Sequence, residues 1–273
     1  MRRLLIAFVF SVIPLTAQAQ DARLQSLDTT DAGRAWQAVG QLDISGAGFC
    51  TGALIAPDLV LTAAHCLFDK TTGKQINPET IEFRAGWRNG RASAYRMVKR
   101  AVVHPNYDYG DAVSSERVRN DVALLELRRE IRNTTVVPFE TAPRPVAGDQ
   151  VGVVSYAMDR ANAPSLQEVC AVLARQQGVL VMSCNVDFGS SGAPIFSFEA
   201  GRPQIVSVVS AKAEVHGEKV ALGTALDEPL SLLKARLEAG EGFAVAPAPR
   251  VNRITVGDAR RETGAKFVRP GGS

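Results

Sequence analysis

Short runs of apolar and β-branched residues recur through the middle of the chain, and they constrain the fold more than any other feature. Examples are "WQAVGQLDI", "LVLTAA", "DVALLEL", "QVGVVSYA" and "QIVSVVSA", separated by segments rich in Gly, Pro, Asp and Asn. Many short strands with turn residues between them are typical of a sandwich or a barrel. The long helical segments that a parallel α/β sheet requires are missing. The sequence therefore predicts an all-β protein.

One amphipathic pattern stands near the C-terminal end. Residues 227–239, "DEPLSLLKARLEA", place Leu230, Leu233 and Leu237 on one helical face, begin with acidic residues and are followed by Gly240. Acidic residues in a first turn and Gly after the last turn are helix boundary signals. We expect one C-terminal helix on the β protein.

The N-terminus has the pattern of a secretory signal peptide. Within residues 1–19, Arg2 and Arg3 precede an apolar run that ends in Ala-Gln-Ala, a small-x-small cleavage pattern. The run is too short to cross a bilayer comfortably. The sequence therefore predicts a secreted or periplasmic protein without a stable membrane anchor.

The rest of the chain divides by composition into three segments. Residues 20–33 form a lead segment, residues 34–242 form the folded domain, and residues 243–273, rich in Ala, Pro, Gly and Arg, are predicted to be a disordered basic tail. The net charge is +3, with basic residues scattered among acidic ones. This distribution does not favour nucleic-acid binding, and we expect a monomer.

The cysteines are predicted to form disulfides. There are four: Cys50, Cys66, Cys170 and Cys184. They form no CxxC pair and no cluster with histidines, so no metal site is expected. The first two are equidistant from Asp58 and the last two from Gln177, so each pair flanks a predicted hairpin. Facing residues of antiparallel strands have Cα atoms about 4.5–5.5 Å apart, which suits a disulfide, so we predict the pairs 50–66 and 170–184.

Ser191 lies in "CNVDFGSSGAPIF", a segment that by itself indicates only a tight turn. A serine hydroxyl is a nucleophile only when a base accepts its proton and donors stabilise the oxyanion. His65, at the end of the predicted strand in "LTAAHC", and Asp121, at the start of "DVALLEL", supply a base and a carboxylate to orient it. Either residue alone has a structural explanation, as a buried histidine or a turn cap.

Three motifs in order, "CTGALIAPDLVLTAAHC", "NDVALLEL" and "GSSGAPIF", resemble the chymotrypsin-like serine proteases. The resemblance extends roughly from Trp36 to Ala239. It implies two six-stranded Greek-key β-barrels with a C-terminal helix, an active site between the barrels, polypeptide substrates and no cofactor. It also makes residues 34–242 a protease domain.

The resemblance assigns roles to particular residues. It makes Ser191 the nucleophile, His65 the general base and Asp121 the residue that orients it, and it builds the oxyanion hole from the backbone N–H groups of Gly189 and Ser191. Animal members mature when a new N-terminus pairs with an aspartate before the nucleophile. That position is Ser190 here. We therefore expect no switch of this kind.

The predicted substrate pocket departs from the well-known specificities. Trypsin-type enzymes have an aspartate six positions before the nucleophile, where this chain has Asn185, and glutamyl endopeptidases have a histidine where it has Val209. Ser210 and Lys212 are expected to border the pocket together with Asn185. Neither basic nor acidic specificity is therefore indicated.

The leading hypothesis is a secreted serine endopeptidase that acts through an acyl-enzyme on Ser191. The alternative is a catalytically silent protein of the same fold that acts as a binding module. A third hypothesis, an esterase with a G-x-S-x-G elbow, is less well supported, because Gly192 and Ala193 follow the serine directly.

Overall fold

The computed structural model describes residues 24–110, 112–142, 145–187, 189–199, 201–215 and 217–244. The predicted signal peptide, and the predicted tail beyond residue 244, lie outside the described residues.

The first half of the chain forms a closed antiparallel barrel, with neighbours in the order β2-β3-β4-β7-β6-β5. Its strands are β2 (Val39–Ile44), β3 (Phe49–Ala56), β4 (Leu59–Thr62), β5 (Ile81–Ala85), β6 (Ala94–Val103) and β7 (Ala123–Leu127). In β5 the side chains alternate between buried and half-buried, as expected when one face of a strand lines a barrel core.

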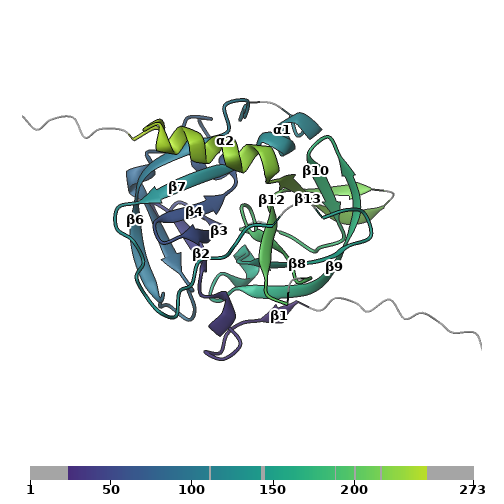
Figure 1. Ribbon diagram of the computed structural model, residues 1–273, viewed down its shortest axis with the longest axis horizontal. Coiled ribbons are helices and arrows are strands. Elements are labelled where there is room, and N and C mark those ends of the chain that lie inside the picture. Colours follow the sequence, from purple (N-terminus) through teal and green to yellow (C-terminus); the bar gives the residue numbers. More distant parts are fainter. Residues whose placement is uncertain are drawn as a thin grey trace, which may run out of the picture.

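The second half repeats this connectivity in the order β8-β9-β10-β13-β12-β11, and pairing of β8 with β9 closes the ring. Its strands are β8 (Gln150–Ser155), β9 (Ser165–Gln176), β10 (Val179–Met182), β11 (Pro194–Ser197), β12 (Gln204–Val215) and β13 (Glu218–Ala225). The two barrels lie side by side (Figure 1). The predicted all-β fold with two six-stranded barrels is confirmed.

Few helices accompany the barrels. The α-helices are α1 (Ser115–Asn120) and α2 (Asp227–Glu238), and the 3-10 helices are η1 (Arg34–Trp36), η2 (Ala64–Leu67), η3 (Pro78–Thr80) and η4 (Met158–Arg160). The predicted C-terminal helix is thus confirmed to within one residue, with Leu230 and Leu233 buried. No helix in the described part of the chain is both long and apolar enough to span a bilayer.

Both ends of the described chain pack against the barrels. Strand β1 (Gln25–Ser26) pairs with β9, and Leu27 is fully buried. These residues belong to the segment that the sequence analysis placed ahead of the folded domain. At the other end Phe243 exchanges backbone hydrogen bonds of 2.9 and 3.1 Å with Ala101 of β6. Hydrophobic burial and strand pairing therefore extend the fold beyond the boundaries expected from composition.

The structure contains the disulfides Cys50–Cys66 and Cys170–Cys184, with Cα atoms 6.2 and 5.0 Å apart. Only the second disulfide joins the two arms of a hairpin, as predicted for both. Cys184 lies two residues beyond the end of β10, and Cys170 lies in the paired strand β9, two residues before the partner of Met182. Cys66 instead lies in η2, beyond the end of β4, while Cys50 pairs in the sheet with Leu42. The first disulfide therefore ties η2 to β3 rather than linking two facing strands.

Aromatic side chains join the two barrels. The Trp36 and Phe139 rings pack against Phe196 of β11, with centroid distances of 5.0 and 4.8 Å. Edge-to-face contacts of this kind add to the energy gained by burying the rings. One hydrophobic core includes these rings and residues of both barrels, so the barrels are held in a fixed relation.

Candidate active site

Two loops of the first barrel bring His65 and Asp121 together. His65 lies in η2, immediately after β4, and Asp121 is the residue that ends α1, immediately before β7. Strands β4 and β7 are paired neighbours, with Thr62 opposite Ala123. The two side chains therefore meet at one end of this strand pair.

The His65–Asp121 contact fixes the imidazole. His65 Nδ1 is 2.7 Å from Asp121 Oδ2, and the His65 backbone N–H donates to Asp121 Oδ1 at 2.8 Å. A carboxylate only accepts hydrogen bonds, so Nδ1–H is the donor in this contact and Nε2 takes no part in it. Asp121 is only 2% exposed, which keeps water from competing for this contact. The arrangement leaves Nε2 available to a group in the cleft that His65 borders.

Ser210 is a third partner of this pair. Its hydroxyl donates to Asp121 Oδ2 at 2.5 Å. From the sequence, Ser210 is expected only to border the pocket. It does line the cleft, but its hydroxyl is engaged with the carboxylate. Ser210 therefore holds the Asp121 carboxylate in place together with the two His65 contacts.

Ser191 belongs to the nucleophile loop, residues 189–193, which precedes β11 in the second barrel. Its hydroxyl makes no hydrogen bond to any residue that the structure describes, and no such bond joins it to His65. Ser191 and His65 nevertheless line the same cleft. Catalytic hydrogen bonds are often long or poorly aligned before substrate binds.

Two backbone donors in the nucleophile loop are unused. Ser190 N–H donates to Asp187 O at 2.9 Å, Gly192 N–H to Val209 O at 2.8 Å and Ala193 N–H to Ser190 O at 2.9 Å. The N–H groups of Gly189 and Ser191, by contrast, donate to none of the described residues. Free donors beside a serine are what an oxyanion requires.

Gly189 adopts a conformation that only glycine takes readily. Its φ is +95°, and a Cβ atom there would lie 2.5 Å from the Phe49 ring and 2.9 Å from Ala157 Cα. Positive φ and a close neighbour both exclude a side chain. The loop therefore has a glycine where its backbone passes beside the Phe49 ring of β3.

A cleft of about 520 Å³ holds the site between the barrels. His65 borders it from the first barrel, and Ser191, Ser210 and Lys212 border it from the second. Asn185 does not line it, contrary to expectation: it is exposed, and its N–H donates to Gln167 Oε1 at 2.7 Å. The two residues that follow Asn185 line the cleft instead.

Those two residues are Val186 and Asp187. Lys212 Nζ donates to Asp187 Oδ1 at 2.9 Å, and both side chains are about half exposed. Lys212 is thus at the cleft as expected, with its charge directed at an acidic neighbour. An exposed ion pair of this kind contributes little to stability, and here it lies across one border of the cleft.

Nearby tyrosines stay protonated. Burial raises the pKa of Tyr107 far above its usual value, and the negative charge of Asp121 raises it further. Burial likewise raises the pKa of Tyr156, whose hydroxyl donates to Trp87 O at 2.8 Å. Neither phenol can therefore act as a base beside His65 near neutral pH.

The one group of possible metal ligands found among the described residues does not offer a metal site. Ligand atoms of Cys50, His65 and Cys66 lie within 4.8 Å of one another. The two cysteines are joined in a disulfide, however, and a disulfide has no thiolate to bind a metal ion.

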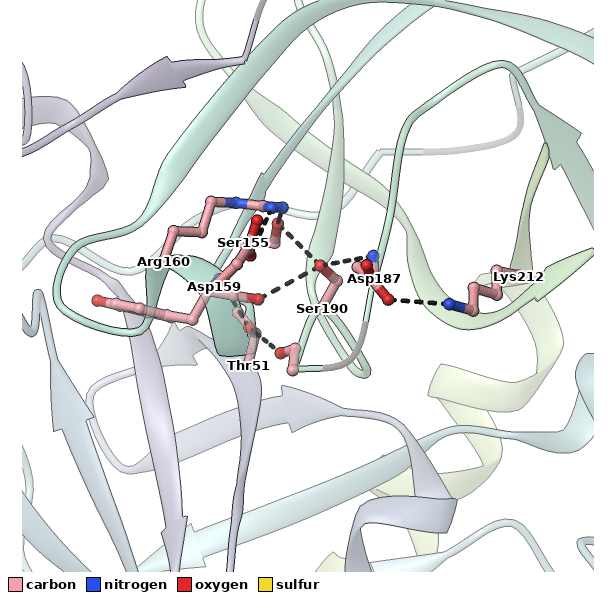
Figure 2. A network of polar contacts seen from close by, with 9 residues as sticks. Thr51, Ser155, Asp159, Arg160, Asp187, Ser190 and Lys212 are labelled. Carbon is pink, nitrogen blue, oxygen red and sulfur yellow. Dashed lines mark hydrogen bonds and ion pairs between the residues drawn. The ribbon is translucent and has the colours of Figure 1, made fainter. Parts of the chain in front are cut away.

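Ser190 is fully buried, and its hydroxyl belongs to the network of polar contacts drawn in Figure 2. Its hydroxyl lies 3.2 Å from Ser155 Oγ and 3.3 Å from Tyr156 O, and it accepts from Asp187 N–H at 3.4 Å. Arg160 in turn donates to Ser155 Oγ. The loop is thus anchored here by hydroxyl groups.

A second anchor, Thr51 of β3, was missed from the sequence. Its Oγ1 donates to Gly189 O at 2.9 Å. The available signal was a threonine within the apolar strand "CTGALIA", because a buried hydroxyl needs a partner. That signal does not identify the partner.

Two six-stranded barrels, with a histidine–aspartate pair on one and a glycine-flanked serine on the other, define the chymotrypsin-like class of protein. Residues 26–222 match the family model described as Trypsin. The chain belongs to the trypsin family.

Individual relatives agree with this assignment. The chain is 33% identical to "Mast cell protease 3" of Ovis aries over 152 residues, which are 53% of this chain and 56% of that protein. It is 24% identical to "Glutamyl endopeptidase" of Bacillus licheniformis over 182 residues, 63% of this chain and 53% of the relative. The chain thus spans little more than half the length of these relatives.

A solved structure shares the fold. "Structure of Glu endopeptidase in complex with MPD" superposes with a TM-score of 0.66 at 17% identity, covering 81% of this chain and 98% of that one. At this identity the likeness concerns the fold alone.

Proposed function

We propose that the protein is a serine endopeptidase that cleaves peptide bonds through an acyl-enzyme on Ser191. One observation carries the proposal: the N–H groups of Gly189 and Ser191 donate to none of the described residues, beside a serine that shares its cleft with an imidazole held by Asp121. Such donors have no structural task, and they suit the oxygen of a tetrahedral intermediate.

The proposed reaction proceeds in two halves. Ser191 Oγ attacks the substrate carbonyl carbon while His65 Nε2 accepts the hydroxyl proton, and the two N–H groups bind the oxyanion. His65 then gives the proton to the leaving amine, and the acyl-enzyme remains. Water, deprotonated by His65, attacks the ester in the same way and releases the carboxylic acid and Ser191. Asp121 and Ser210 stabilise the imidazolium that forms in each half.

Labelling with a fluorophosphonate probe tests this proposal. We expect one label on the native protein, mapped by mass spectrometry to Ser191, and none after denaturation, because only an activated serine reacts. Peptide and ester panels then separate a peptidase from an esterase. Failure of the folded, disulfide-bonded protein to label would favour the alternative of a silent binding module.

We propose that the enzyme prefers apolar residues on the leaving-group side of the scissile bond. His65 must reach the leaving amine, so the leaving peptide extends over the first-barrel side of the cleft. This side is lined by four half-buried apolar residues, Ile44, Phe49, Phe68 and Ile76. We expect substrates with Leu or Phe after the scissile bond to have kcat/KM about ten-fold above those with Asp there.

Two isoleucine variants, one within the lining of the cleft and one outside it, test this expectation. Ile44→Ala, within the lining, is expected to lower the Leu-to-Asp ratio about five-fold. Ile55→Ala removes a similar half-buried side chain outside the cleft and should leave the ratio as it is. An unchanged ratio in Ile44→Ala would contradict the proposed placement of the leaving peptide.

We also propose that the protein is exported, with residues 1–19 removed as a signal peptide. The two disulfides support export, because such bonds persist in oxidising compartments. N-terminal sequencing of the mature protein tests the cleavage site.

A further inference from the structure

We propose that Thr51 is a positioning residue that holds the nucleophile loop in the form in which its oxyanion donors are free. The inference rests on the proposed function for its catalytic consequence. Its structural part, that a threonine hydroxyl of the first barrel fixes a loop of the second, stands on contacts alone.

Every polar group of Thr51 is used. Thr51 is fully buried, and its Oγ1 donates to Gly189 O at 2.9 Å while accepting from Tyr156 N–H at 3.1 Å. Its backbone N–H donates to Ser191 O at 2.9 Å. Its carbonyl accepts from the Thr62 hydroxyl, also at 2.9 Å. One residue of β3 therefore binds the carbonyls on both sides of Ser190.

These bonds anchor the backbone on both sides of the Ser191 N–H. Peptide groups are planar, so binding a carbonyl also fixes the N–H of the following residue. Thr51 holds the 189–190 and 191–192 peptide planes, and Ala193 N–H holds the plane between them through Ser190 O at 2.9 Å. The Ser191 N–H belongs to this central plane. Three consecutive peptide planes are thus anchored, and Thr51 anchors the outer two.

The hydroxyl, rather than the shape of the side chain, is the specific element. Valine would fill the same space but leave both Gly189 O and Tyr156 N–H without their shared partner. An unpaired buried polar group is costly, and the Gly189 carbonyl can recover a partner only by rotating its peptide. Rotation of that peptide changes the backbone that carries the oxyanion donors.

The second barrel supplies a complementary anchor. The Ser190 side chain contacts Ser155 and Tyr156 O, next to the Tyr156 N–H that Thr51 binds (Figure 2). Thr51 of the first barrel and Ser190 of the loop therefore both bind at the end of β8. Neither the Thr51 contacts nor the Ser190 contacts include the charged amino group of an N-terminus.

The test compares Thr51→Val with Thr51→Ser. We expect Thr51→Val to lower kcat about 30-fold with KM changed less than about three-fold, because an oxyanion donor acts on the transition state. Backbone amides of the nucleophile loop should exchange with deuterium at least about ten-fold faster. Thr51→Ser keeps the hydroxyl and should restore both values to near wild type.

Ser207→Ala is the control for loss of a buried hydroxyl, since Ser207 Oγ donates to Thr224 O at 2.8 Å outside the loop. It should lower stability without changing exchange in the loop. The inference would be overturned if Thr51→Val had the loop exchange rates and the kcat of the wild type. It would also be overturned if Thr51→Ser changed both quantities as much as Thr51→Val does.

The exchange measurement needs no turnover, so the two proposals fail separately. If the wild type cleaves no substrate, the proposed function fails, while faster loop exchange in Thr51→Val still supports the structural role and unchanged exchange overturns it.

Discussion

Replacing Ser191 by alanine is expected to lower kcat/KM by about 10⁵-fold, and replacing His65 by alanine by a similar factor. The double variant should lose no more than either single variant. The physical reason is that His65 contributes by moving the Ser191 proton, so once either partner is missing the other has nothing to act on. If the two residues contributed independently, the fold-losses in kcat/KM of the single variants would multiply in the double variant.

Steady-state kinetics of the three variants on one peptide substrate measures this. Stability should barely change in Ser191→Ala, because the hydroxyl has no hydrogen-bond partner among the described residues. Urea unfolding checks that point. Multiplied losses in the double variant would mean that His65 acts on something other than Ser191.

Gly192→Ala is expected to destabilise the fold by about 4 kcal/mol or more. Gly192 has φ +74°, and a Cβ there would lie 2.1 Å from Thr62 Oγ1 and 2.5 Å from Thr51 O. The Thr51 oxygen is a backbone atom in a buried strand, so it cannot move aside cheaply. The alanine would therefore separate the nucleophile loop from β3.

Gly46→Ala isolates the cost of this clash. Gly46 has a similar φ of +72°, but a Cβ there would meet no described atom within 4 Å. This variant should cost only about 1–2 kcal/mol, the penalty for a side chain in left-handed backbone. Urea midpoints of the two variants give the comparison. Equal losses would show that φ alone, and not contact with β3, constrains the loop.

Local signals in the sequence were sufficient for most of the architecture. Alternating apolar runs predicted the strands, leucine spacing predicted α2, and turn residues predicted the hairpin that brings Cys170 to Cys184. These features depend on neighbours in the chain. The Cys50–Cys66 disulfide was predicted correctly for a wrong reason, since η2 rather than a facing strand carries Cys66.

Contacts between distant segments could not be read from the sequence. Ser210 and Asp121 are 89 residues apart, and the Thr51–Gly189 bond spans 138 residues. Such pairs depend on how the barrels dock, which no local pattern encodes. Asn185 was misplaced for a related reason: counting back from Ser191 does not reveal which way the loop turns after Cys184.

The division of the site between two barrels also sets an order of events during maturation. His65 and Asp121 come from the first barrel to be synthesised, while Ser191 and its donors come from the second. The Thr51 hydroxyl of the first barrel bonds to the Gly189 carbonyl of the second. A chain in which only the first barrel has folded therefore has an incomplete site. Hydrolytic capacity would arise only when docking is complete, which protects the machinery that handles the nascent protein.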